Sequence, residues 1–206
     1  MRERAVRAPV EWSVAKRCRR GEATSGDLAV VAIVPGGALV AGVDGLGHGA
    51  AAARAARRAG EAVRASPDLD LVRLMERCHT ALRGTRGAAI SLAFISTSEG
   101  GMTWLGVGNV EGRVVSGTPS ATRPKGSLAL GSGVAGYELP AVRTAALEVR
   151  PGDVLMFATD GVDPSFADSL DLSGSTHAIT ERIMARHRKP ADDALVVAVR
   201  YLGAAR

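Results

Sequence analysis

The chain has 206 residues, 46% of them hydrophobic and 3% aromatic, and its 26 Lys and Arg outnumber its 21 Asp and Glu. That length suffices for one well-buried core and no linker-like stretch divides it, so we expect a single domain over 1–206. The apolar stretch 28–34 is far shorter than the roughly 20 residues that a bilayer requires, and the cations lack interleaved aromatics, so we expect a soluble cytoplasmic chain that binds neither membrane nor nucleic acid.

The N-terminal part of the chain is expected to form strands and then helices. Apolar runs bounded by turn residues predict the strands, and Pro35-Gly36-Gly37 is a turn between two of them. An Ala-rich helix is expected before Ser66-Pro67, and the helix after it has apolar residues at spacings of three and four. The predicted strands are 10–18, 28–34 and 38–43, and the predicted helices are 48–65 and 70–82.

Strands return after these helices. Two helices in succession, followed by strands in hairpin order, favour an α+β fold in which helices cover antiparallel sheets over simple alternation of strand and helix. A loop rich in Pro, Gly and Ser is expected between residues 115 and 142. The predicted strands are 88–95, 102–107, 110–115, 142–149, 154–158 and 194–201, with a last helix within 175–187.

Aspartates stand at the ends of four predicted strands. Several carboxylates at one edge of a sheet repel one another unless they are protonated or neutralised, and Mg²⁺ or Mn²⁺ is the usual counter-charge for oxygen ligands. A single Asp-Gly is more often a turn, but the repetition at strand ends favours a metal site. These residues are Asp27, Asp44 with Gly45 after it, Asp160, and the pair Asp192 and Asp193.

The glycine-rich run after Asp44 also permits another interpretation. Residues Gly45 to Ala50 match G-x-G-x-x-A after a strand and before a helix, the pattern of dinucleotide-binding folds. Against it, Asp44 would repel a pyrophosphate, a second helix follows instead of a parallel strand, and no acid ends such a strand about 20 residues later. Nucleotide binding is kept as an alternative.

The ordered motifs resemble the metal-dependent type-2C (PP2C) protein serine/threonine phosphatases, within them the bacterial SpoIIE/RsbX-like branch, and most closely its stressosome members. The resemblance covers nearly the whole chain. It rests on Ser25-Gly26-Asp27, Asp44-Gly45-Leu46-Gly47-His48-Gly49, Arg86-Gly87-Ala88-Ala89, Gly106-Val107-Gly108-Asn109-Val110, Ala158-Thr159-Asp160-Gly161-Val162 and Asp192-Asp193-Ala194.

The resemblance implies a four-layer α-β-β-α sandwich of two antiparallel sheets flanked by helix pairs. It also implies a site for two Mn²⁺ or Mg²⁺ ions, in which Asp44 bridges both ions and Gly45 offers its carbonyl. Asp27, Asp160 and Asp192 would be the other ligands, with Asp193 as second choice, and Asp44 and Asp160 would be the catalytic residues.

The implied activity is hydrolysis of phosphoserine or phosphothreonine by a metal-activated water. The implied substrates are phosphorylated stressosome proteins with the sulfate-transporter/anti-sigma-antagonist (STAS) fold, and we expect a monomer. A non-catalytic scaffold with the same fold is the other alternative. Two roles stay open. One is an Arg that grips the phosphate (Arg17, Arg19 or Arg20), and the other is a general-acid role for His48, which is out of register with the His that follows Asp-Gly in eukaryotic relatives.

Overall fold

The computed structural model describes residues 8–65, 70–98, 100–118 and 121–203. Within these ranges the chain forms ten strands, three α-helices and one short 3-10 helix. The strands are β1 (Val10–Arg17), β2 (Asp27–Val34), β3 (Gly37–Gly45), β4 (Ala88–Ser96), β5 (Gly101–Val107), β6 (Glu111–Thr118), β7 (Ala121–Ser127), β8 (Ala145–Glu148), β9 (Val154–Ala158) and β10 (Ala194–Tyr201). The helices are α1 (Gly49–Ala65), α2 (Leu71–Leu82), α3 (Thr176–His187) and the 3-10 helix η1 (Pro164–Ser169).

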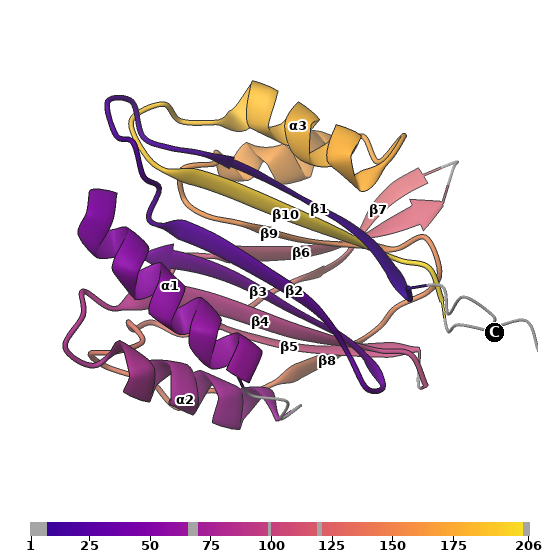
Figure 1. Ribbon diagram of the computed structural model, residues 1–206. Coiled ribbons are helices and arrows are strands. Elements are labelled where there is room, and N and C mark those ends of the chain that lie inside the picture. Colours follow the sequence, from indigo (N-terminus) through magenta and orange to yellow (C-terminus); the bar gives the residue numbers. More distant parts are fainter. Residues whose placement is uncertain (1–7, 66–69, 99, 119–120, 204–206) are drawn as a thin grey trace, which may run out of the picture.

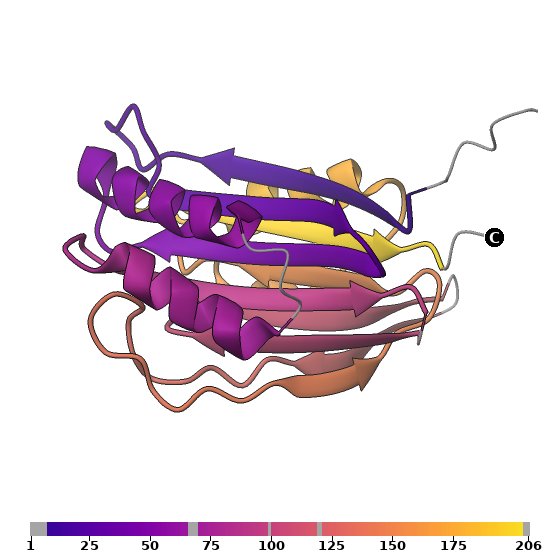
Figure 2. The same ribbon diagram turned by 60° about the horizontal axis from the view of Figure 1, so that its bottom comes forward.

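Two five-stranded sheets pack face to face with helices outside them (Figure 1). One sheet has the order β1-β10-β9-β6-β7 and the other β2-β3-β4-β5-β8, and the named strands pair antiparallel throughout. Helices α1 and α2 cover the second sheet, as Figure 2 also shows, while α3 and η1 cover the first. The expected layered α+β sandwich is therefore confirmed.

Three hydrophobic cores fill the spaces between the four layers. In β3, Leu39 and Ala41 pack under the helices, whereas Ala38 and Val40 face the other sheet. Successive side chains of a strand point to opposite faces, and a strand covered on both sides must be apolar on both. This explains why 38–43 is a continuous apolar run without polar alternation.

Local sequence features explain where α2 begins and how closely α1 packs on the second sheet. Asp70 caps α2, since its Oδ1 accepts from the backbone N–H groups of Val72 and Arg73, as N-cap residues commonly do. Helix α1 presents a face of Ala and Gly, and a Cβ on Gly60 would lie 2.3 Å from Leu28 Cδ2. The small residues therefore let α1 lie close to β2.

The structure corrects the expected elements in the long loop. Residues 121–127 form β7, an edge strand that the prediction missed because Pro124 disfavours a strand reading. Proline is tolerated at a sheet edge, and the register shifts between Val114 and Val115, where Val115 pairs with Pro124. The strand expected over 142–149 is only Ala145–Glu148, and η1 was also unpredicted.

The strand ends that carry the aspartates meet at one end of the sandwich, on the left in Figures 1 and 2. There β3 and β9 end, while β2 and β10 begin. Antiparallel pairing of β2 with β3 and of β9 with β10 places these ends side by side.

Among the helices of the described residues, none combines the length and the apolar character needed to cross a membrane.

The core between the sheets yields a first prediction. Phe157 is fully buried there, and Cβ atoms on Gly42 and Gly112 would each lie 3.0 Å from its side chain. Phe157→Ala should lower the free energy of unfolding in urea by about 3–5 kcal/mol, because it opens a cavity where two glycines cannot fill the space. Ile33→Ala, at a side chain 53% exposed, is the control and should cost less than about 1 kcal/mol. Equal losses would contradict this view of the core.

Candidate metal centre

Asp27 and Asp44 lie opposite each other on adjacent strands. They are register partners at the start of β2 and the end of β3, and Asp27 is only 2% exposed. Burial raises the pKa of Asp27 to about 8, and the negative charge of Asp44 adds to the shift. Burial also raises the pKa of Asp44 to about 7, and the negative charge of Asp160 makes the next largest upward contribution. Both carboxyl groups are therefore held where ionisation is unfavourable without positive charge.

A threonine of the other sheet fixes the orientation of Asp27. The Thr159 hydroxyl donates to Asp27 Oδ2 at 2.9 Å and accepts from the backbone N–H of Leu195 at 2.9 Å. Thr159 follows β9 and is 1% exposed. This buried bond joins the two sheets at the acidic end, and sequence analysis assigned Thr159 no role.

Asp160 is held by an amide side chain that sequence analysis quoted but did not assign. Asn109 Nδ2 donates to Asp160 Oδ2 at 2.7 Å, and a hydrogen bond from Asn109 also lowers the pKa of Asp44. Asn109 therefore lies between the two carboxylates. It follows Gly108, whose φ is +93° and where a Cβ would lie 2.4 Å from Ala89 Cβ. In the sequence, the turn Gly108-Asn109 between two strands was the signal that could have identified Asn109 as a site residue.

The two neighbouring aspartates before β10 have different surroundings. Asp193 is 3% exposed, and its two carboxylate oxygens accept from the backbone N–H groups of Arg19 at 2.7 Å and Gly26 at 2.8 Å. It thereby holds the loop before β2 in place. Asp192 is partly exposed and accepts from the backbone N–H of Asp193. Its other oxygen has no protein hydrogen bond in the described chain, which favours Asp192 over Asp193 as a ligand.

Gly45 is required by the close approach of α1. A Cβ at this position would lie 2.3 Å from the backbone oxygen of Ala52, and the Gly45 N–H donates to the Gly26 oxygen at 3.1 Å. A larger residue would push α1 away from the end of β3. The position of the Asp44 backbone therefore depends on a residue without a side chain.

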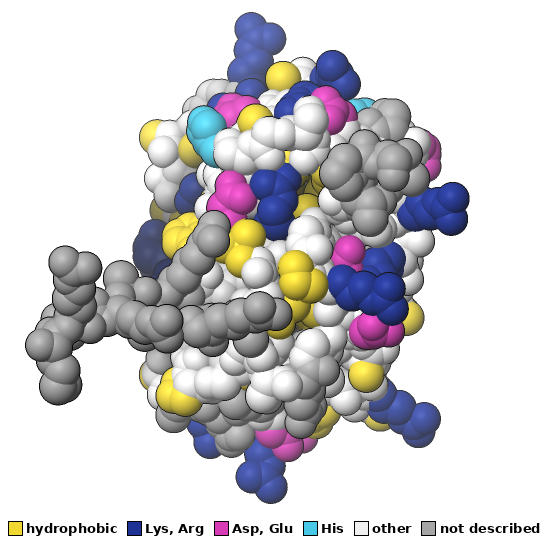
Figure 3. All heavy atoms as spheres, turned by 90° about the vertical axis from the view of Figure 1, so that its right-hand side faces the viewer, with side chains coloured by type: hydrophobic (Ala, Val, Ile, Leu, Met, Phe, Trp, Pro, Cys, Tyr) yellow, Lys and Arg dark blue, Asp and Glu magenta, His cyan; other side chains and the backbone are white. Residues whose placement is uncertain are grey.

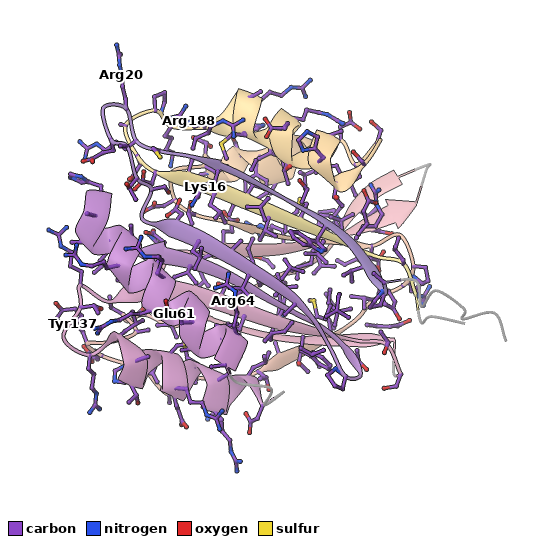
Figure 4. The ribbon with its side chains drawn as sticks, viewed as in Figure 1. Lys16, Arg20, Glu61, Arg64, Tyr137 and Arg188 are labelled. Carbon is purple, nitrogen blue, oxygen red and sulfur yellow. The ribbon has the colours of Figure 1, made fainter. Side chains whose placement is uncertain are left out.

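The candidate phosphate-gripping arginines have different partners. Arg17 forms an ion pair with Glu181 at 2.7 Å, Arg19 contributes its backbone N–H to Asp193, and Arg20 projects away from its loop (Figure 4). His48 Nδ1 lies 2.7 Å from Glu22 Oε1. The general-acid role of His48 receives no support from this pairing.

The donors at this end suit a hard divalent cation. Asp27, Asp44, Asp160 and Asp192 offer only oxygen atoms, the ligands that Mg²⁺ and Mn²⁺ prefer. Their carboxylates act on one another electrostatically, raising pKa values that bound positive charge would lower. In the part of the chain that the structure describes, no three Asp, Glu, His or Cys side chains form a preformed metal-binding group. These residues therefore suit a divalent cation by the type of their donor atoms, by their placement at strand ends and by their negative charge.

Comparison with known proteins gives results for both sequence and fold. Residues 35–202 match the family model described as stage II sporulation protein E (SpoIIE). Among curated proteins, none matches the sequence.

Solved structures with similar folds include the following three. One, described under "The bacterial stressosome: a modular system that has been adapted to control secondary messenger signaling", is 28% identical with a TM-score of 0.83, covering 93% of this chain and 99% of that one. RsbX in complex with magnesium is 21% identical with a TM-score of 0.79, covering 93% and 95%. The Mycobacterium tuberculosis serine/threonine phosphatase PstP/Ppp is 15% identical with a TM-score of 0.68, covering 94% and 99%.

The raised pKa of Asp27 predicts how stability depends on pH without metal. The folded chain holds a proton up to pH of about 8, whereas an unfolded Asp loses it near pH 4. More protons are bound in the folded state between these values, so the free energy of unfolding should fall as pH rises through this window. With chelator present, we expect a loss of about 1–3 kcal/mol between pH 5 and pH 8 in urea denaturation.

The variant Asp27→Asn should reduce this dependence and leave the part that Asp44 contributes, because asparagine keeps an oxygen for Thr159 and does not titrate. Asp171→Asn is the control, since Asp171 is exposed and its pKa is lowered by hydrogen bonds to Ser173. That control should keep the wild-type slope. Wild-type stability that does not change with pH under these conditions would show that Asp27 is not held in the protonated form.

Proposed function

The chain belongs to the stage II sporulation protein E (SpoIIE) family and is a PP2C-type serine/threonine phosphatase, and we propose that it dephosphorylates stressosome proteins with the STAS fold in a stress-signalling pathway. The observation that carries the proposal is the acidic end of the sandwich. There Asp27 and Asp44 are paired across β2 and β3 with raised pKa values, next to Asp160.

The metal ligands follow from these surroundings. PP2C phosphatases generally use Mn²⁺ or Mg²⁺, and we propose two such ions here. Asp44 would contact both, as the resemblance implies, and it lies near enough to Asp160 and Asp192 for their negative charges to raise its pKa. The remaining ligands would be Asp27, the Gly45 carbonyl, Asp160 and Asp192, with Asp193 as second choice.

The residues of the chain hold this arrangement in place. Bound ions would supply positive charge for the phosphoryl oxygens and lower the pKa of water for attack on phosphorus. Thr159 fixes one oxygen of Asp27, and Asn109 fixes one oxygen of Asp160 and also hydrogen-bonds to Asp44. Asp44 and Asp160 are therefore preorganised, and preorganised polar groups generally contribute most to such catalysis.

The stressosome assignment rests on similarity. The similar protein that covers 93% of this chain at 28% identity is described with the bacterial stressosome, and the structure of RsbX contains magnesium. On that basis we propose phosphoserine or phosphothreonine in STAS-domain proteins as the substrate. We also propose a cytoplasmic monomer with one domain over residues 1–206.

Two other functions are less well supported. A nucleotide site at Gly45 to Ala50 would need a parallel strand after α1, but α2 and the antiparallel strand β4 follow. A non-catalytic scaffold has no need of buried carboxylates with raised pKa values. Binding of Mn²⁺, measured by titration calorimetry, distinguishes the scaffold from the enzyme.

Replacement of Asp44 tests the metal centre. Asp44→Asn should lower kcat/KM for p-nitrophenyl phosphate with Mn²⁺ by at least about a hundredfold, because it removes the carboxylate between the proposed ions. Asp171→Asn, an exposed aspartate paired with Arg182, is the control and should keep wild-type activity. An Asp44→Asn variant as fast as wild type would refute the site assignment.

The substrate class needs a separate measurement. Phosphorylated stressosome proteins and an unrelated phosphoprotein, each incubated with and without chelator, should show fast phosphate release only from the stressosome proteins and only without chelator. Equal release from both would refute the substrate assignment and leave the phosphatase assignment intact.

A further inference from the structure

A hollow beside the candidate metal centre is lined by arginines. It has a volume of about 420 Å³ and lies between the first turns of α1 and the loop after α2. Its lining residues are Ala51, Arg54, Arg58, Gly84, Thr85 and Arg86. The three arginines are exposed, and no acidic residue lines the hollow.

Arg86 connects the hollow to the metal centre. A Cβ on Gly47 would lie 2.7 Å from Arg86 Nη1, and the Leu46 N–H donates to the Gly87 oxygen at 3.0 Å. The guanidinium group therefore lies against the loop that follows Asp44 and Gly45. A segment in the hollow would lie next to a phosphorylated residue at the metal centre.

Arg54 and Arg58 are an unfavourable pair in the chain alone. Residues four apart on a helix are neighbours, and like charges there destabilise the helix slightly. Within the described residues, Arg54, Arg58 and Arg86 make no ion pair or hydrogen bond. The acid of α1, Glu61 (labelled in Figure 4), does not line the hollow, and nearby Glu22 is paired with His48.

The opposite end of the molecule is different. Figure 3 shows Lys and Arg interspersed with Asp and Glu on that face. Several cations elsewhere in the fold have acidic partners, such as Lys125 with Asp153 at 2.5 Å and Arg150 with Glu148 at 2.9 Å. The hollow thus gathers positive charge that the chain itself does not neutralise.

We propose that the hollow of Arg54, Arg58 and Arg86 binds an acidic segment of the substrate phosphoprotein, next to the residue that is dephosphorylated. Guanidinium groups bind carboxylates through two parallel hydrogen bonds, and the positive end of the α1 dipole adds to the attraction. The proposal rests on the phosphatase function and adds the substrate feature that the enzyme selects.

The test compares two double variants with the same loss of charge. Arg54→Gln/Arg58→Gln removes two arginines of the hollow, while Arg57→Gln/Arg64→Gln removes two from the same helix outside it. The substrates are a phosphoserine peptide flanked by glutamates, the same peptide flanked by glutamines, and p-nitrophenyl phosphate as reference.

The hollow variant should lose about tenfold in kcat/KM on the glutamate peptide relative to the reference, through KM. The control variant should lose less than about twofold, and salt should weaken the wild-type preference. Equal losses in both double variants, or equal losses on glutamate and glutamine peptides, would overturn the proposal.

A binding measurement separates this proposal from the phosphatase assignment. Fluorescence anisotropy with a labelled, unphosphorylated glutamate-rich peptide should give a Kd that rises about tenfold in the hollow variant. If the wild type hydrolyses no substrate but this difference is found, the phosphatase function fails and the acidic-segment site remains. If the Kd values agree, the site is refuted whatever the activity.

Discussion

A buried hydrogen bond from the Thr159 hydroxyl to Asp27 fixes how the two halves of this protein meet at their functional end, and the bond from the Gly26 N–H to Asp193 supports it. Asp27 belongs to the sheet under α1, and Thr159 follows the last residue of β9 in the other sheet. A buried carboxylate needs hydrogen-bond partners, so the sheets cannot slide past each other here without leaving Asp27 unsatisfied. The mutual position of Asp44 and Asp160, one from each sheet, depends on that constraint.

The remainder of the fold compensates for this concentration of negative charge. Three apolar cores stabilise the sandwich along its length, and the aspartates of the candidate metal centre lie at or beside strand ends. Asp193 shows how an acid becomes structural, since both of its oxygens accept backbone N–H groups. Asp27 and Asp44 keep raised pKa values instead. Functional sites commonly retain such locally unfavourable features.

Much of the architecture could be predicted from the sequence, because an element buried on one or both faces has a regular pattern of apolar residues. The strand-end aspartates were recognisable for the same reason. Contacts between distant segments produce no such pattern. Thr159 hydrogen-bonds to Asp27, 132 residues away in the chain, and Asn109 to Asp160, 51 residues away. Strand β7 was missed because Pro124 is read as a loop residue unless its edge position is known. The ligand set itself remains a prediction.

Pro124 also affects how the molecule behaves beside its own copies. Strand β7 forms one outer margin of the sandwich, and the four-residue strand β8 forms the corresponding margin of the other sheet. An unpaired strand edge is a template for intermolecular pairing, but Pro124 has no N–H to donate and β8 is too short to hold a partner strand firmly. These two edges therefore resist pairing with another copy of the chain, whereas β1 and β2, eight residues each, form the opposite edges of the two sheets.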